Sequence, residues 1–365
     1  MRFCTLIALI AGASLAGADL PPHEWNASAA ARFLDQRESW WAAWPDAARD
    51  HQTFCVSCHT AIPYALARPV LRTVLGETTA PGERQLRENV AKRVGLGSEA
   101  LPYYPGQDRQ SRGTEAVGNA IVLAALDAAA GRLSSEGRAA LDAMWTLQET
   151  SGPMKGAWPW INFYNEPWEG NDSPFYGACL AALATGLAPE NYQAAIKIRG
   201  PLEILREYLT EQYPKQSLLN QAFLLLASTK LRGLLTAAQQ RAIASGLLNA
   251  QRDDGGWSSS SIAWSLRAAG FSAMSKVWRS DASPLHTHSD GLATGVVVFA
   301  LEQSGPPHAD QQLQRGVAWL NQNQSPTGEW RAESSNKHRD PTPGPGLFMT
   351  DAATAFAALA LAGAH

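Results

Sequence analysis

The chain lacks several features that would narrow its function. Lysine and arginine number 30 against 33 aspartates and glutamates, so no basic excess offers a surface to nucleic acid. Only four cysteines and five methionines occur, and no methionine lies between Met1 and Met144. Beyond the first residues, no apolar run is long enough to cross a bilayer. We therefore expect no nucleic-acid partner and no transmembrane segment in the mature chain.

The N-terminal stretch MRFCTLIALIAGASLAGADLPP has the form of a secretory signal peptide. Arg2 supplies a positive start, and the apolar run from Leu6 to Leu15 is too short to span a membrane. Ala16-Gly17-Ala18 reads as a small-residue cleavage site, with an uncleaved anchor as the alternative. We expect residues 1–18 to be removed and the mature protein to be periplasmic or secreted.

Cys55-Val56-Ser57-Cys58-His59 has the pattern C-x-x-C-H, which is typical of covalent haem attachment. Two thiols at this spacing can each form a thioether with a haem vinyl group, and His59 then binds the iron as proximal ligand. A redox-active disulfide, a structural disulfide and half of a zinc site are alternatives, although no second cysteine pair completes a zinc site. The motif and the export signal together predict a haem c cofactor.

The sequence leaves the sixth ligand of that iron open. The candidates are Met154, His286, His288, Met349 and His51, or no protein ligand. An open position would suit small-ligand or peroxide chemistry, whereas a filled one would suit electron transfer.

From about residue 82 onward, two kinds of helical pattern alternate. One kind is amphipathic, as in SEGRAALDAMWTLQE and ADQQLQRGVAWLNQNQ. The other is rich in small residues and apolar nearly all round, as in SPFYGACLAALATG and TDAATAFAALALAGA, and must be buried on most sides. Alternating outer and inner helices predict an all-α protein, an α/α toroid of two concentric rings.

An internal repeat marks the turns between these helices. Gln251 to Trp257 and Gln324 to Trp330 share the form Q-x-x-x-G-x-W, and a looser version runs from Gln148 to Trp158. In each, we expect the Gln to bond backbone where an outer helix ends, the Gly to permit a tight turn and the Trp to cover the junction.

These turns on alternating helices resemble the squalene–hopene cyclase and prenyltransferase repeat superfamily, over roughly residues 82–365. The resemblance implies the toroid, whereas chemistry has to be argued from a site. The Asp-x-Asp-Asp motif of the cyclases is absent from this sequence, and Asp253-Asp254 belongs to a repeat turn. The zinc ligands of the protein prenyltransferases have no counterpart, because Cys179 is the only spare thiol and reads as a buried residue. The toroidal polysaccharide lyases share similar turns, but no lyase constellation is found.

Four acidic residues follow a capping residue near predicted starts of apolar helices. They are Glu115, Asp172, Asp290 and Asp351. In a toroid the inner helices start at one end of the cavity, so these carboxylates could ring its mouth and serve as a general acid or hold a polar ligand. The alternative is ordinary helix capping.

Aromatic residues gather in KGAWPWINFYNEPWEGNDSPFYG, which includes Trp158, Trp160, Phe163, Tyr164 and Trp168. Such a loop could stack on a sugar, a polyprenyl chain or haem, or could pack internally. A second set, Trp40, Trp41 and Trp44, is expected to shield haem edges or to fill the seam between the haem segment and the toroid.

The sequence thus predicts a signal peptide at 1–18, a helical haem-attachment segment at 19–81 and a toroid at 82–365. The predicted function is that of an exported haem c protein, linked to redox chemistry or electron transfer, with an apolar ligand or substrate cavity. A periplasmic redox partner and an apolar or aromatic ligand are expected. The alternatives are a terpenoid-cyclase-superfamily enzyme and a disulfide-containing binding scaffold without haem, so whether the protein is an enzyme stays open.

Overall fold

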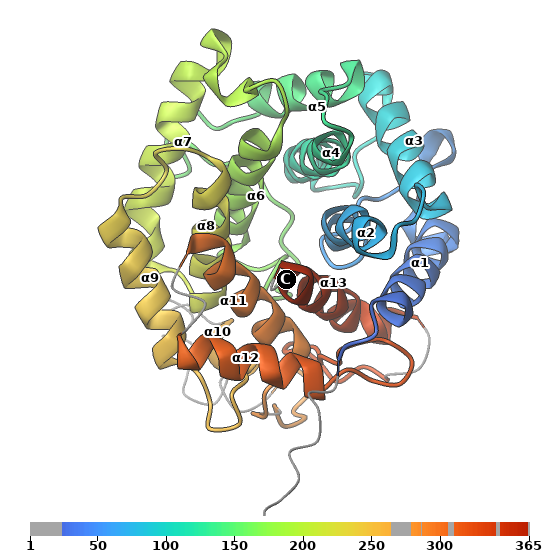
Figure 1. Cartoon of the computed structure of the whole chain (residues 1–365). Helices are drawn as coiled ribbons and strands as arrows, with labels where there is room; N and C mark the ends of the chain where they lie inside the picture. Colours follow the sequence, from blue (N-terminus) through green and yellow to red (C-terminus); the bar gives the residue numbers. More distant parts are fainter. Residues whose placement is uncertain (1–23, 264–278, 286, 306–309, 341–343, 364–365) are drawn as a thin grey trace, which may run out of the picture.

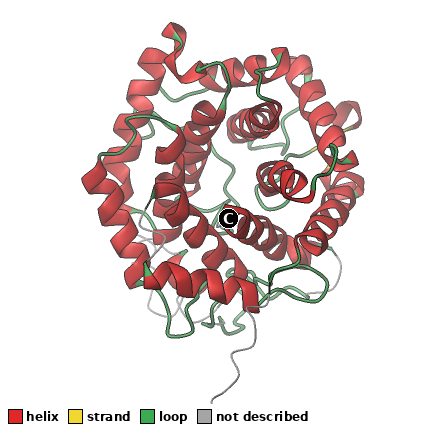
Figure 2. Ribbon diagram, in the orientation of Figure 1, coloured by secondary structure: helices red, strands yellow, loops and turns green. Residues whose placement is uncertain are grey.

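The computed structural model describes residues 24–263, 279–285, 287–305, 310–340 and 344–363. The predicted signal peptide at 1–18 and His286 lie outside these residues. The described chain is all-α and forms two concentric rings of helices (Figures 1 and 2). The predicted α/α toroid is therefore confirmed.

Each ring has members from the whole length of the chain. The inner ring, in order, is α2 (Ala61–Leu75), α4 (Asp108–Ala130), α6 (Ser173–Leu187), α8 (Leu218–Lys230), α11 (Gly291–Ser304) and α13 (Phe348–Gly363). The outer ring is α1 (Ala27–Ala43), α3 (Pro81–Leu96), α5 (Ser135–Thr146), α7 (Arg199–Gln212), α9 (Ala237–Asn249) and α12 (Gln311–Gln322). Inner neighbours pack pairwise around the ring, and α13 closes it against α2.

Short elements decorate the connections. The short helix α10 spans Ser259–Ile262, and strands β1 (Ala48–Arg49) and β2 (Thr53–Phe54) form a two-stranded antiparallel sheet that pairs Ala48 with Phe54. Single 3-10 turns lie at Pro45–Ala47, Asp50–Gln52, Gly97–Glu99, Tyr192–Ala194, Ile196–Ile198, Tyr213–Lys215 and Pro345–Leu347.

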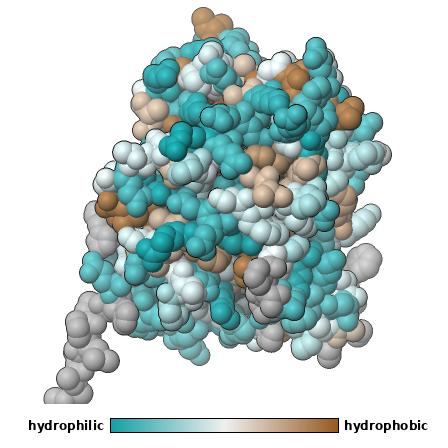
Figure 3. All heavy atoms as spheres, turned by 90° about the vertical axis from the view of Figure 1, so that its right-hand side faces the viewer, coloured by the Kyte–Doolittle hydropathy of each residue, from teal (hydrophilic) through white to brown (hydrophobic). Residues whose placement is uncertain are grey.

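Composition decides which ring a helix joins. In α13, residues Met349 to Leu361 are all buried, and α11 is buried over most of its length. Small residues let these helices approach closely: a Cβ on Gly295 of α11 would lie 2.6 Å from the backbone nitrogen of Ala357 in α13. Outer helices bury one face only, as in α12, where Leu313, Gly316 and Leu320 are buried. The surface over the side of α1 to α3 is accordingly mostly hydrophilic (Figure 3).

The repeat turns make the predicted contacts. Gln251 and Gln324 each donate a side-chain hydrogen bond to the carbonyl of the turn glycine, Gly255 at 2.8 Å and Gly328 at 2.9 Å. Both glycines have positive φ, 90° and 105°, which non-glycine residues adopt only with strain. The looser version behaves alike, since Gln148 donates to the carbonyl of Gly156 at 3.1 Å.

The tryptophan of each turn ties the turn to the preceding outer helix. The indole N–H groups of Trp158, Trp257 and Trp330 donate to the carbonyls of Met144, Leu247 and Leu320 at 2.7–2.8 Å. All three indoles are completely buried. The motif is therefore an architectural device that joins an outer helix to the next turn.

The first two helices belong to the rings, which the sequence boundary at residue 82 did not anticipate. Helix α2 packs between α13 and α4 in the inner ring, and α1 covers α2 from outside (Figure 1). Neither is followed by a Q-x-x-x-G-x-W turn, and the C-x-x-C-H motif between them suggested a separate segment. We therefore describe one toroid from α1 to α13, with the motif inside a connection of that toroid.

The two ends of the toroid have unequal connections. Outer-to-inner connections include the long stretches 147–172 and 323–347, whereas inner-to-outer ones include 76–80 and 131–134. The segment Pro345–Gly363 is long and apolar enough to cross a membrane, yet 72% of its most apolar window is buried inside the toroid, as is usual for a core helix.

Candidate functional site

A pocket of about 250 Å³ opens at the end of the toroid where the inner helices begin. It is bordered by residues just before α2, by the first residues of α13, and by the two long connections. We call it the aromatic pocket. Its lining residues are Trp41, Trp44, Asp46, His59, Tyr104, Phe163, Asn165, Glu166, Trp168, Glu169, Ser334, Asn336, Arg339, Pro345, Gly346, Phe348 and Met349.

Aromatic rings form one wall of this pocket. His59 stacks on Phe348 with ring centroids 3.7 Å apart, and the edge of Trp41 meets His59 at 4.9 Å. Trp44 lies 5.9 Å from Phe348. Trp168 is buried, and its indole N–H has no partner among the described residues. The wall thus offers ring faces to a ligand.

A second part of the lining comes from the connection 147–172, which also carries Trp168. A backbone bridge pairs Asn165 with Glu169, and Trp160 donates its indole N–H to the carbonyl of Trp168 at 2.8 Å. Asn336, from the connection before α13, accepts from the Glu166 N–H at 3.0 Å and donates to the Glu166 carbonyl at 2.6 Å. These bonds hold the two long connections together, so the carboxyl groups they carry keep fixed positions.

Glu166 and Glu169 are two half-buried carboxyl groups of this wall. Burial raises the pKa of Glu169 above its ordinary value, against a hydrogen bond from Asn165 and the charge of Arg339. Burial also raises the pKa of Glu166, and the nearby charge of Asp172 adds to this, while backbone hydrogen bonds, one from Asn171, oppose it. Carboxyl groups with raised pKa values in an apolar pocket can donate protons near neutral pH.

His59 is held by a chain of hydrogen bonds. Thr60 donates its hydroxyl proton to Asp351 at 2.7 Å, so its oxygen is free to accept from the Nδ1 of His59 at 2.9 Å. Arg37 makes two further bonds to Asp351, at 2.6 and 3.0 Å. Burial lowers the pKa of His59 to about 3, with the charges of Arg37 and Arg339 adding to the effect, so the imidazole is neutral. This arrangement assigns the proton to Nδ1 and leaves Nε2 as an acceptor.

The two motif thiols lie inside the protein near this pocket. Cys55 and Cys58 are free and are 5% and 6% exposed. Burial raises the pKa of Cys55 to about 12 and that of Cys58 well above its ordinary value, so neither is a reactive thiolate. The disulfide of the binding-scaffold alternative is therefore absent from this structure, and Cys179 is buried as expected.

Covalent haem attachment at Cys55 and Cys58, with His59 toward the iron, stays a prediction. His59 lines the aromatic pocket and its Nδ1 bond leaves Nε2 for a ligand, whereas Cys55 and Cys58 are buried and do not line this pocket. The intact mass of the exported chain, produced together with a haem-ligation system, measures this attachment directly. A gain of one haem would confirm the attachment, and an unmodified mass would contradict it.

The candidate sixth ligands are scattered. Met349 is the one that lines the aromatic pocket with His59. Met154 lies in a different, polar depression beside Asp172, and His288 is exposed near Asp290. The exposed His51 lies with its Nε2 3.6 Å from a carboxylate oxygen of Asp50.

Three of the four predicted cavity acids make local hydrogen bonds or ion pairs, and none of the four lines the aromatic pocket. Glu115 makes a two-pronged ion pair with Arg93 at 2.7 and 2.9 Å. Asp351 is paired with Arg37 as described above. Helix α4 begins at Asp108, so Glu115 lies about two turns inside it rather than at its start. Gly113 lies inside α4, and Pro159 packs where a Cβ of this residue would be.

Of the other two acids, Asp290 caps its helix through its side chain and Asp172 does not. Asp290 caps α11 by accepting from the N–H groups of Leu292 and Ala293 at 3.0 Å, and it also accepts from Ser259. Asp172 occupies the N-cap position of α6 without a side-chain cap bond. Neither lines the aromatic pocket.

Sequence reasoning found the aromatic loop and the tryptophans of α1, but it missed Glu166, Glu169, Asn336 and Arg339. The two glutamates stand beside Trp168 in NEPWEG, so acids within an aromatic stretch were the available signal. Asn336 and Arg339 carried no local signal, because only the closed ring brings them to the pocket.

Fold and site together define a class, the α/α toroid with a pocket at the start of the inner ring. No protein-family model matches the chain, and no curated protein matches it. Several solved structures, however, match its fold. One, named a glycosidase variant, has a TM-score of 0.56 at 11% identity over 92% of this chain and 96% of its own.

A second solved structure, a glycosidase variant in complex with glucose, has a TM-score of 0.53 at 11% identity over the same shares. A possible member of the GH105 family from Klebsiella pneumoniae subsp. pneumoniae has a TM-score of 0.48 at 11% identity over 98% of both chains. At this identity the likeness shows the fold.

These comparisons correct the functional prediction. The two solved structures with TM-scores of 0.56 and 0.53, which cover 92% of this chain, are named glycosidases rather than redox proteins or terpenoid cyclases. This finding contradicts the predicted electron-transfer protein and its cyclase alternative. Across the described ranges, no group of three or more His, Cys, Asp and Glu side chains is placed to hold a metal ion, so iron and electron transfer gain no support there.

Proposed function

We propose that the protein is a glycoside hydrolase that binds a sugar in the aromatic pocket. The observation that carries the proposal is the meeting of two half-buried carboxyl groups with raised pKa values and a wall of aromatic rings in one pocket. Glycoside hydrolysis commonly uses two carboxyl groups, one of them protonated at working pH. The named activity of the toroids described above adds to this support.

Glu169 is the proton donor in this proposal. It lines the pocket together with Trp168, Tyr104 and Phe163, and burial favours the neutral form of its carboxyl group. It donates its proton to the glycosidic oxygen as the bond to the leaving group breaks. Glu166 acts as the partner carboxylate: it takes a proton from the water molecule whose oxygen bonds to the anomeric carbon as the leaving group departs. Backbone hydrogen bonds to its carboxyl group oppose the effect of burial on its pKa.

The remaining polar groups orient the sugar. The Nε2 of His59 accepts a hydrogen bond from a sugar hydroxyl, since its proton is on Nδ1. Phe348 and Trp44 offer ring faces to the C–H face of the pyranose.

The test is hydrolysis of a panel of disaccharides and p-nitrophenyl glycosides by the full chain. For disaccharides, Glu169→Gln is expected to lower kcat by about 10²- to 10⁴-fold, because glutamine has no proton to give. For p-nitrophenyl glycosides the loss is expected to be much smaller, because nitrophenolate leaves without protonation. The matched control is Glu88→Gln, an exposed glutamate on α3, which is expected to keep full activity.

The pH profile gives a second readout. Because Glu169 works as an acid with a raised pKa, activity on disaccharides falls as pH rises through that pKa and the carboxyl ionises. Equal losses in Glu169→Gln for both substrate types would contradict the acid role. No hydrolysis of any substrate by the unmodified chain would contradict the proposed function.

The resemblance to the squalene–hopene cyclase repeat superfamily is compatible with this proposal. The shared feature is the Q-x-x-x-G-x-W turn, whose contacts in this chain are all within the scaffold. The resemblance therefore concerns architecture, and the chemistry is assigned to the pocket.

A further inference from the structure

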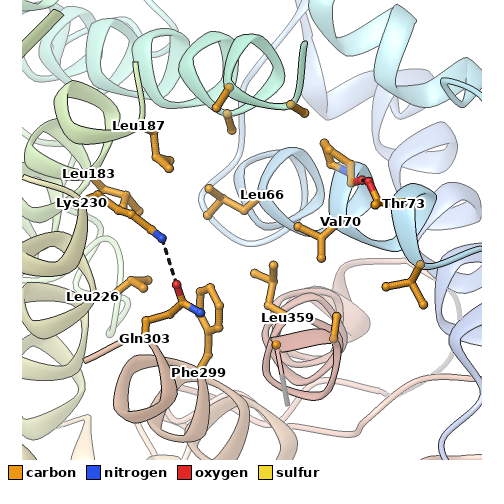
Figure 4. A pocket seen from close by; sticks show the side chains of 17 residues that line it. Leu66, Val70, Thr73, Leu183, Leu187, Leu226, Lys230, Phe299, Gln303 and Leu359 are labelled. Carbon is orange, nitrogen blue, oxygen red and sulfur yellow. Dashed lines mark hydrogen bonds between the residues drawn. The ribbon is translucent and has the colours of Figure 1, made fainter. Parts of the chain in front are cut away.

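A second cavity lies at the opposite end of the toroid, where the inner helices finish. It has a volume of about 490 Å³ and is lined by the last turns of all six inner helices. We call it the apolar bowl. Leu66, Leu183, Leu187, Leu226, Phe299 and Leu359 point into it (Figure 4).

The apolar character of the bowl extends to its rim. Val70 and Val74 of α2 line it and are 37% and 50% exposed. In the part of the chain that the structure describes, the connections 76–80, 131–134 and 231–236 at this end are much shorter than 147–172 at the other end. Exposed apolar surface of this kind costs free energy in water and marks a binding surface.

One cation reaches into this apolar surface. Lys230, the last residue of α8, is half-buried and donates to the Oε1 of Gln303 at 2.9 Å, as the dashed line in Figure 4 marks. No carboxylate of the described chain lies within ion-pair distance of its ammonium group. A partly desolvated ammonium with no counterion is an incomplete ion pair, and an anion would complete it.

Two more polar side chains, those of Gln303 and Glu302, lie near Lys230 on this side of the toroid. The Nε2 of Gln303 and the Oε2 of Glu302 lie 3.7 and 3.5 Å from where a Cβ of Gly363 would be, and Gly363 lines the bowl. The Oε2 of Glu302 is buried with no hydrogen-bond partner among the described residues. The polar groups thus gather on one side of the cavity, formed by α8, α11 and the end of α13.

We propose that the apolar bowl binds a single-chain carboxylate of the fatty-acid class. The carboxylate pairs with the ammonium of Lys230 and accepts from Gln303, and the alkyl chain lies along the leucines and Phe299. The inference does not rest on the proposed glycosidase, since the aromatic pocket and the bowl share no lining residue.

The experiment is calorimetric titration of the full chain with dodecanoate, dodecanol and acetate. Dodecanoate is expected to bind with one site, dodecanol more weakly, and acetate without measurable affinity, because both the charge and the chain contribute. Lys230→Met keeps the length of the side chain and removes its charge. It is expected to weaken dodecanoate about tenfold and to leave dodecanol unchanged.

Two further variants keep the test decisive. Lys155→Met, at an exposed lysine outside the bowl, is the matched control and is expected to bind dodecanoate as the unmodified chain does. Leu226→Trp fills the cavity and is expected to abolish binding of both long-chain probes, with circular dichroism confirming the fold. Absence of dodecanoate binding, or equal dodecanoate affinity in Lys230→Met and the unmodified chain, would overturn the proposal.

Discussion

The two ends of the toroid are built from the same six inner helices and differ in almost everything else. Where the inner helices begin, long connections carry carboxyl groups, amides and aromatic rings into a pocket of about 250 Å³. Where they finish, short connections leave a bowl of about 490 Å³ lined by side chains of the helices themselves. One end is therefore built by loops and the other by the scaffold.

The two ends of the toroid therefore constrain the sequence in different ways, one through hydrogen bonds between loops and the other through helix packing. Groups of the aromatic pocket are fixed by specific hydrogen bonds, such as those between Asn336 and Glu166. Groups of the bowl are positioned mainly by helix packing, together with the bond between Lys230 and Gln303 and a bond from the Thr73 hydroxyl to the Pro69 carbonyl. A loop can change its side chains without altering the ring, whereas bowl residues also take part in inner-helix packing.

The largest expected effect compares a scaffold tryptophan with a bowl aromatic. Trp257→Ala removes a completely buried indole and its bond to Leu247, and is expected to lower the free energy of unfolding by about 3–5 kcal/mol. Phe299→Ala, at a half-buried bowl residue, is expected to cost clearly less, because its ring is partly in water. Chemical denaturation measures both changes. Equal losses in the free energy of unfolding would mean that Phe299 belongs to the closed hydrophobic core and not to an open bowl.

A smaller effect is expected for a tryptophan of the aromatic pocket. Trp44→Ala removes a half-buried ring that stacks on Trp40 at 5.1 Å and borders Phe348. Sugar binding is expected to weaken by about 1–2 kcal/mol, roughly tenfold in Kd. Calorimetry with the best disaccharide of the panel measures this, and dodecanoate binding serves as the control. A loss at both ends would show that the two sites are not independent.

A third prediction concerns the pH dependence of stability, which is expected from a buried carboxyl group on α1. Glu38 of α1 is 1% exposed, neither carboxyl oxygen has a partner in the described chain, and burial, with the charge of Asp351, raises its pKa to about 8. The folded state therefore binds a proton that the unfolded chain releases near pH 4.3. The stability that this proton provides is complete below pH 4.3 and is lost as pH rises through 8.

Glu38→Gln carries no ionisable group, so it is expected to flatten this fall in stability between pH 5 and pH 9. Thermal unfolding at several pH values measures the slope. The exposed Glu88→Gln is the control and is expected to keep the slope of the unmodified chain. An unchanged slope in Glu38→Gln would show that another group titrates there.

Much of the scaffold could be predicted from local patterns. Apolar stretches with no polar face, such as the one that became α13, have to be buried on all sides, and their alternation with amphipathic stretches leads to two rings. The roles of Gln251 and Trp257 also followed from the motif, because their bonds close within a few residues of the turn. Helix starts were harder, as Glu115 shows, since the close approach of Pro159 to Gly113 is a tertiary contact.

The sequence by itself determined the all-α class, the alternation of rings and the turns that join them, because these depend on residues near one another in the chain. It also supplied the prediction of haem attachment, which the fold neither requires nor tests. Only the tertiary structure decided that the C-x-x-C-H connection belongs to the toroid. The same closure of α13 against α2 brings Phe348 and Arg339 beside His59 and Glu169, and so makes the pocket. Contacts over such separations depend on the closed ring, which no local pattern encodes.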